Sequence, residues 1–224
     1  MTSYDDTGAP VKADFDYDQY GNVTNKREYG NQISGAWQVR RRTHLTYGIA
    51  YKPRLVTLVE AFDGLQNSSD ADDVLIAKTS YAYDNYAAMG GMEDWGGAAP
   101  PGHFIGWNTS YTTRGNVTGV TEWTDLQAGT TVQHLAKIDI FGNVVKAQVS
   151  CCQEKDLTNT EDTYWSQAEI ETSGDPNGAH TTTSTDYDFN TSLAASHTDA
   201  AGLTTEIGYN AALQPSFATL PTGA

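Results

Sequence analysis

Phe15-Asp16-Tyr17-Asp18-Gln19-Tyr20-Gly21-Asn22-Val23-Thr24 reads as a strand, a tight turn and a return strand. An aromatic residue ends the first strand, and Asp18 begins the turn because its carboxylate can bond backbone amides two residues further on. Gly21 then supplies a positive φ, and the β-branched pair Val23-Thr24 begins the returning strand. The stretch therefore predicts a β-hairpin.

The same phrase recurs along the chain. Tyr111 to Thr118 and Ile138 to Val145 repeat its frame, each with Gly-Asn-Val, and Thr198 to Thr204 is a weaker copy. One such hairpin is a weak signal, but repetition in one chain indicates a repeat architecture. The predicted turn residues are Tyr17, Asp18, Gly21, Asn22, Gly115, Asn116, Asp139, Gly142, Asn143, Asp199 and Gly202.

The residues between the copies favour strands. From Trp37 to Tyr51, apolar and polar residues alternate with a period of two, which predicts one buried and one solvated face. Arg41 and Thr43 fall in the apolar phase, so we expect a bulge or a polar pocket there. Residues 54–62 and 75–83 look like the two strands of a further hairpin.

Composition supports the same fold class. Hydrophobic residues make up 38% of the chain, Gly and Tyr number 21 and 13, and long runs of helix-forming residues are absent. We expect an all-β protein of antiparallel hairpin repeats that form an open, curved sheet. Residues 1–224 would be a single sheet segment with irregular insertions at about 87–106 and 153–178. Within the second, Asp175-Pro176-Asn177-Gly178 predicts a type I turn.

Charge excludes some classes of partner. The net charge is −15, which repels phosphate backbones and anionic membrane surfaces, so we expect no nucleic-acid partner.

The most apolar stretch, residues 55–62, is too short to span a membrane. The start of the chain resembles no secretory signal. Cys151 and Cys152 are adjacent, so on a strand they would point to opposite faces and not bridge readily.

No pattern singles out catalytic, cofactor-binding or metal-binding residues. Asp14, Asp16 and Asp18 alternate along a strand and could bind Ca²⁺, but they do not follow the EF-hand pattern. A solvated acidic face is the simpler interpretation, as it is for Asp70, Asp72 and Asp73. The five histidines are scattered, and carboxylates are so abundant that no glycosidase pair can be identified.

Aromatic residues leave one alternative open. Trp95, Trp107, Trp123 and Trp165 could form a platform on which sugars stack, with Trp95 and Trp107 as the leading candidates. The favoured interpretation is that these rings fill the thin core of a sheet that has few aliphatic residues. The alternative function is a surface module that binds a glycan or a protein.

The phrase at Tyr17 to Thr24 resembles the YD repeat of bacterial RHS proteins, whose relatives build the BC component of Tc toxins and the teneurin shell. Residues 41–51, 81–84 and 198–205 also resemble stretches of large RHS proteins. The resemblance implies a β-ribbon that spirals into a hollow shell around a C-terminal effector. It also implies repeat side chains that do no chemistry, and a secreted or cell-surface location.

The chain is too short for a closed shell of this family, so we expect either a segment or a short relative with an open sheet. Its partners would be the remainder of its own polypeptide and an enclosed effector. Unpaired strand edges would also favour self-association. Asp175-Pro176-Asn177-Gly178 resembles the self-cleavage element at the end of RHS cores. Repeat-like sequence follows it here, so the turn is the favoured interpretation.

Overall fold

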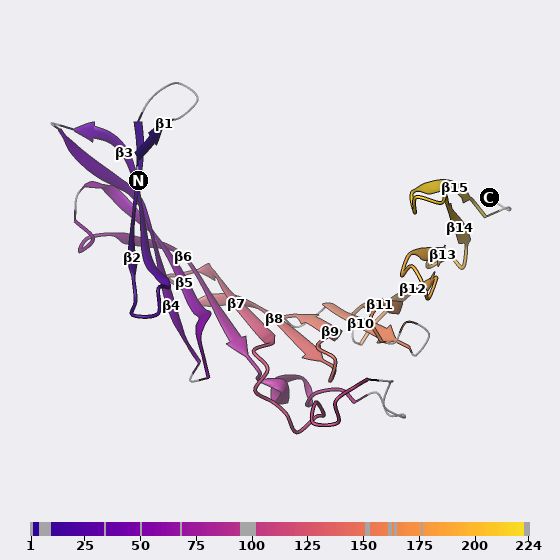
Figure 1. Cartoon of the computed structure of the whole chain (residues 1–224). Helices are drawn as coiled ribbons and strands as arrows, with labels where there is room; N and C mark the ends of the chain where they lie inside the picture. The colour runs from indigo at the N-terminus through magenta and orange to yellow at the C-terminus, as the bar shows by residue number, and fades with distance from the viewer. Residues whose placement is uncertain are drawn as a thin grey trace. The chain divides into compact units, whose positions relative to one another are not determined.

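The structure is a computed structural model that describes residues 2–4, 10–33, 35–49, 51–67, 69–94, 102–150, 153–160, 163, 165–175 and 177–221; Cys151 and Cys152 lie outside these ranges. The described residues form strands in the order of the chain, and each strand has its chain neighbours as its sheet neighbours (Figure 1). The all-β, antiparallel prediction is confirmed. The elements are β1 (Thr2–Tyr4), β2 (Pro10–Tyr17), β3 (Val23–Ile33), β4 (Ala36–Ile49), β5 (Lys52–Asn67), β6 (Val74–Tyr83), the 3₁₀ helix η1 (Tyr86–Met89), β7 (Val117–Asp125), β8 (Thr130–Ile138), β9 (Val144–Val149), β10 (Gln153–Asn159), β11 (Ala168–Gly174), β12 (His180–Tyr187), β13 (Ala194–Thr198), β14 (Thr204–Tyr209) and β15 (Pro215–Thr219).

The chain divides into two compact units. The first comprises residues 1–84 and 119–133, and the second comprises residues 85–118 and 134–224. Within each unit the described strands lie in a single layer (Figure 1). Among the described residues no second sheet packs on this layer, so its side chains cover one another along its own faces.

The first unit is built around the long strands β4 and β5. Their register shifts between Val39 and Arg41, which confirms the predicted bulge near Arg41. The predicted hairpin of residues 54–62 and 75–83 is also confirmed, with Leu58 opposite Ser80. Because β5 continues to Asn67, the connection to β6 is shorter than the sequence suggested.

The apolar core is thin. Among the described residues, the buried hydrophobic side chains are Val39, Ala61, Tyr86, Ile138 and Ile140. Along β4 only Val39 is buried, and most of its neighbours are half-buried. The two faces of β4 therefore differ less in exposure than the alternation of the sequence predicted. In the described residues, no second sheet covers either face.

The predicted irregular insertion at residues 153–178 is wrong for most of its length, because β10 and β11 occupy it. β10 pairs with β9 without a register shift, and with β11 with one shift, between Thr158 and Asn159. Its sequence, Gln-Glu-Lys-Asp-Leu-Thr-Asn, has almost no apolar alternation. Cross-strand ion pairs stabilise it instead, with Lys146 on Glu154 and Lys155 on Glu171. Hydrophobic periodicity cannot detect such a strand.

Within the second unit, the segment between β6 and β7 is anchored to the Asp139 turn. Glu93 forms an isolated parallel bridge with Asp139. Its amide donates to the Ile138 carbonyl at 2.9 Å, and its carbonyl accepts the Ile140 amide at 3.0 Å. Ile138, Asp139 and Ile140 are at most 5% exposed. The core of the second unit therefore lies where this segment meets the Asp139 turn.

We predict that Gly64→Ala destabilises the first unit. A Cβ at Gly64 would lie 2.5 Å from the Val39 carbonyl oxygen, and this buried backbone has no room to move. Overpacking of this kind costs about 1–3 kcal/mol, measurable by urea unfolding.

The matched control is Gly30→Ala, whose Cβ would lie nearest to the flexible side chain of Arg40 and not to a backbone atom. We expect its free energy of unfolding to change by no more than about 0.5 kcal/mol. Equal losses in the two variants would contradict the packing argument.

Candidate functional site

The predicted repeat turn forms at Asp18 as a closed hydrogen-bonded loop. The Asp18 amide donates to the Asn22 carbonyl at 3.0 Å, and the Gly21 amide donates to the Asp18 carbonyl at 3.1 Å. Asp18 Oδ1 also accepts the amides of Tyr20 (2.8 Å) and Asn22 (2.9 Å). Gly21 has φ 80°, a conformation that costs other residues free energy. The turn chemistry inferred from the sequence is confirmed here.

The turns at Asp139 and Asp199 repeat this geometry. Asp139 Oδ1 accepts the amides of Phe141 and Asn143 at 2.9 and 2.8 Å. Asp199 Oδ1 accepts those of Ala201 and Leu203, both at 2.9 Å. Gly142 and Gly202 have φ 97° and 80°. Three copies of the phrase therefore fold alike although they lie far apart in the sequence.

Desolvation at the first turn tends to raise the pKa of Asp18, but hydrogen bonds from Asn22, Tyr20 and Gly21 outweigh it. The pKa of this carboxyl consequently lies below its ordinary value. The carboxylate form is the acceptor that the turn requires.

The asparagine of the phrase has a second role, which the sequence did not reveal. Asn22 Nδ2 donates to Asp18 Oδ2 at 2.8 Å and to the Pro53 carbonyl at 3.0 Å. Asn143 Nδ2 likewise donates to Asp139 Oδ2 at 2.9 Å and to the Trp165 carbonyl at 2.6 Å. Each acceptor lies at the start of the third strand after the turn, β5, or in the connection that leads into it, before β11. Each asparagine therefore ties one hairpin to the next.

Tyrosines make a second tie between hairpins. The hydroxyls of Tyr47, Tyr83 and Tyr209 donate to the carbonyls of Val23, Val56 and Ala194 at 2.8–2.9 Å. Val23 and Ala194 begin the return strand of the preceding hairpin. Burial raises the pKa of Tyr47 and of Tyr83, which favours the donor form of each hydroxyl. The sequence did not reveal these hydroxyl contacts, although Tyr83 and Tyr209 stand directly before Asp84 and Asn210, as Tyr17 stands before Asp18.

One predicted copy does not form a hairpin turn. Gly115 has φ 81°, but the residues just before it, 111–113, form no strand. Asn116 Nδ2 donates to the Tyr86 hydroxyl at 3.1 Å. This copy has Thr112 where the others have an aspartate, so it lacks the carboxylate that gathers the turn amides. The prediction of a repeat turn at Gly115 and Asn116 was wrong.

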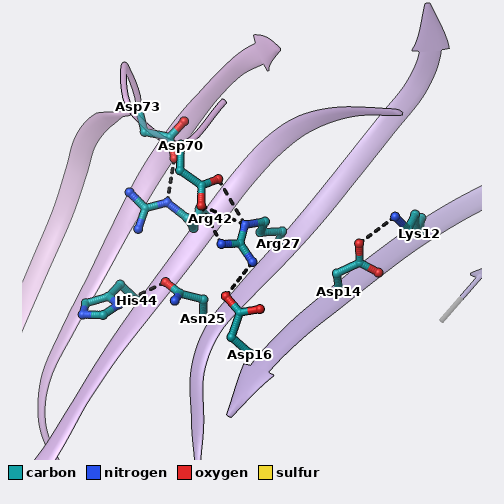
Figure 2. A network of polar contacts seen from close by, with 9 residues as sticks. All are labelled: Lys12, Asp14, Asp16, Asn25, Arg27, Arg42, His44, Asp70 and Asp73. Atoms are coloured by element: carbon teal, nitrogen blue, oxygen red, sulfur yellow. Dashed lines mark hydrogen bonds and ion pairs between the residues drawn. The ribbon is translucent and has the colours of Figure 1, made fainter. Parts of the chain in front are cut away.

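The acidic residues of β2 are divided among different partners (Figure 2). Asp14 pairs with Lys12 at 2.6 Å, and Asp16 pairs with Arg27 at 2.7 Å. Arg27 also pairs with Asp70 at 2.5 Å, and its hydrogen bond lowers the pKa of that carboxyl. Among the residues that the structure describes, no group of three His, Cys, Asp or Glu could hold a metal ion.

A second arginine makes the most buried ion pair of this network. Arg42 Nε lies 2.7 Å from Asp73 Oδ2, and the two side chains are 14% and 0% exposed. The Arg42 guanidinium also lies over the Phe62 ring, 4.0 Å from its centroid. Arg42 and Arg27 together hold the β5–β6 connection against β3 and β4 (Figure 2). The sequence predicted these aspartates to be a solvated cluster, and for Asp73, whose side chain is 0% exposed, that is wrong.

Of the two candidate stacking aromatics, Trp107 does not lie on a face of the sheet. Trp107 lies among turns and bends before β7, and it is 48% exposed. Its ring is 5.5 Å from Tyr111 and 5.3 Å from the Arg114 guanidinium. Arg114 also donates to the carbonyls of Tyr111 (2.7 Å) and Asn108 (2.9 Å). Trp95 lies outside the described residues.

No protein-family model matches the sequence, and no curated protein matches it. Several solved structures, however, are similar to this chain. A crystal structure of TcdB2-TccC3-Cdc42 matches with a TM-score of 0.52 and 11% identity, over 97% of this chain and 10% of that one. The chain has the fold of a segment of TcdB2-TccC3. It spans about a tenth of the length of the solved chain.

Two further structures are similar at lower scores. TcdB2-TccC3 without its hypervariable C-terminal region gives a TM-score of 0.49, with 11% identity, over 94% of this chain and 9% of that one. A Photorhabdus luminescens Tc holotoxin pore gives a TM-score of 0.48, with 10% identity, over 96% of this chain and 10% of that one.

In the described part of the chain, no helix is long and apolar enough to span a membrane.

We predict that Asn22→Ala loosens the first repeat turn. The variant loses the amide that donates to both Asp18 and Pro53. The expected loss in the free energy of unfolding is about 1–2 kcal/mol by urea titration, because each hydrogen bond has a modest net value. Asn190→Ala is the control, since the backbone amide of Asn190 caps the Asp188 turn at 3.2 Å. A similar loss in the control would refute a specific role for the Asn22 amide.

We also predict a large effect at the buried ion pair. Asp73→Ala leaves the Arg42 charge without its partner in a site that is 14% exposed, and such a loss costs about 3–5 kcal/mol. Glu28→Ala breaks the exposed pair with Lys26, which has a value of about 0–1 kcal/mol. Thermal unfolding of both variants measures the contrast. An Asp73→Ala protein as stable as the control would show that the pair contributes little.

Proposed function

We propose that this chain is a non-catalytic structural segment of a longer RHS/YD-repeat polypeptide. In that polypeptide it contributes its strands to a shell or a cell-surface scaffold that encloses a C-terminal effector. The proposal includes export of the polypeptide, directed by a signal elsewhere in it.

The repeat turn is the observation that carries this proposal. One hydrogen-bonded arrangement recurs at Asp18, Asp139 and Asp199, and the strands follow one another without crossover. Such a pattern can be extended at either end by adding another hairpin. The likeness in fold to a segment of TcdB2-TccC3, a chain about ten times longer, agrees with this interpretation.

The functional groups of the repeats are used in structural contacts, which also supports a scaffold. The aspartates of the turns accept backbone amides, and the asparagines and tyrosines donate to backbone carbonyls. Groups committed in this way hold the strands in register and are not arranged around a substrate.

The strand edges indicate how the segment would continue. β15 pairs with β14 along one edge, and all five of its residues are exposed. An exposed edge with its backbone groups in place accepts another strand. In the longer polypeptide, the next repeat would fill this position. In the separate chain, the same edge would favour self-association.

Hydrogen exchange tests the proposal. The amides of β15 should exchange rapidly in the 224-residue chain. In the parent polypeptide they should be protected at least about tenfold more, because a following repeat bonds them. The amides of β5, which lies between β4 and β6, should be protected in both proteins. Unchanged exchange at β15 in the parent polypeptide would count against a continuous sheet.

A further inference from the structure

A cleft of about 430 Å³ lies in the second unit beside the Asp139 turn. Its volume is within the range of small-molecule sites. The anchored segment at Glu93 and Asp94 forms one part of its wall, and strands β8 to β10 form another. The polar and aromatic side chains of the lining include Asp94, Lys137, Lys146, Asp156, Asn159 and Trp165, with Glu93 and Phe141 beside them.

Aromatic rings line one part of the cleft. Phe141 and Trp165 are stacked, with centroids 5.6 Å apart and planes inclined at 20°. His103 packs edge-on against Phe141 at 5.2 Å. Phe141 is therefore held between two rings, and Trp165 has a rigid aromatic backing. A partly exposed tryptophan supported in this way offers an apolar surface at low entropic cost.

The repeat turn fixes the position of Trp165. Its amide donates to the Thr160 carbonyl at 2.8 Å, and its carbonyl accepts Asn143 Nδ2 at 2.6 Å. Its φ is 58°, a conformation that is costly for a bulky side chain and that surrounding contacts must maintain. The scaffold thus places this ring at the cleft through an asparagine contact equivalent to the one that Asn22 makes to Pro53.

The strands supply a polar part of the cleft. Lys137 of β8 lies opposite Lys146 of β9, and Lys146 lies opposite Asp156 of β10. Lys137 pairs with Glu93, and Lys146 pairs with Glu154 and with Asp156, the latter at 3.1 Å. The wall therefore carries both donors and acceptors, with the two lysines side by side and a carboxylate beside each of them. Carboxylates outnumber ammonium groups among the lining residues, which disfavours an anionic ligand.

We propose that this cleft binds a neutral saccharide, with a sugar ring against Trp165 and hydroxyls bonded to Asp94, Asp156, Asn159 and the lysines. A sugar combines an apolar ring face with hydroxyls that both donate and accept, and this cleft combines an aromatic pair with neighbouring donors and acceptors. A cationic ligand would meet Lys137 and Lys146 in the same wall. A wholly apolar ligand would leave their charges desolvated without compensation. The inference does not depend on the proposed scaffold function.

Binding is tested with cellotriose, maltotriose and chitotriose, by saturation-transfer NMR and by tryptophan fluorescence of the full chain. We expect at least one of them to bind, with a dissociation constant on the order of 1 mM. Trp165→Ala should weaken binding at least tenfold. Asp94→Asn, an exposed change that alters no backbone contact, should weaken it several-fold.

Trp107→Ala serves as the matched control, because Trp107 is an exposed tryptophan of the same unit that does not line the cleft. Its affinity should equal that of the unmodified chain, and circular dichroism should show that every variant retains its strands. The proposal fails if none of the three sugars binds, or if Trp107→Ala weakens binding as much as Trp165→Ala. It also fails if a trilysine peptide binds in a manner sensitive to Trp165→Ala while the sugars do not.

Discussion

The structure depends on a carboxylate at the start of each repeat turn. In most sheets the burial of one face fixes strand register, because a slip of one residue would expose the apolar side chains. Here only five apolar side chains are buried in the described part of the chain, so burial does little to fix strand register. The carboxylates of Asp18, Asp139 and Asp199 fix the register instead. Each accepts hydrogen bonds from two turn amides, and these bonds determine the residue at which the chain reverses.

A hairpin fixed at its turn must still be held to its neighbours. Asn22 and Asn143 do this through a side-chain amide that reaches the backbone of the next hairpin, and Tyr83 and Tyr209 through a hydroxyl that reaches the preceding one. Both ties use a backbone carbonyl as acceptor, so they require no particular residue on the partner. This explains how neighbouring repeats can differ widely in sequence while keeping the same turn residues.

Local features of this fold could be predicted, and contacts between distant residues could not. The β2–β3 turn follows from the order of Asp, Gly and β-branched residues within a few positions, and the β5–β6 hairpin follows from two strand-like stretches that are close in the sequence. β10 was missed because its stability comes from charges on neighbouring strands, and the pairing of Arg27 with Asp70 spans 43 residues. The Gly115 copy shows the opposite error, since glycine and asparagine without an aspartate were read as a turn. The Trp165 cleft could not be foreseen, because the segment at Glu93 and the strands β8 to β10 meet only in the folded chain.

The Asp139 turn shows how a repeat can acquire a specific site without losing its structural role. Its carboxylate and its asparagine make the same contacts as their counterparts at Asp18. Two differences are local. The acceptor of Asn143 is the backbone carbonyl of a tryptophan, and the segment between β6 and β7 places Glu93 beside the turn. Neither change disturbs the hydrogen bonds that define the hairpin. A scaffold whose ties use only backbone acceptors leaves the side chains of the tied residues free to vary, and at Trp165 that freedom places an aromatic ring in a polar cleft.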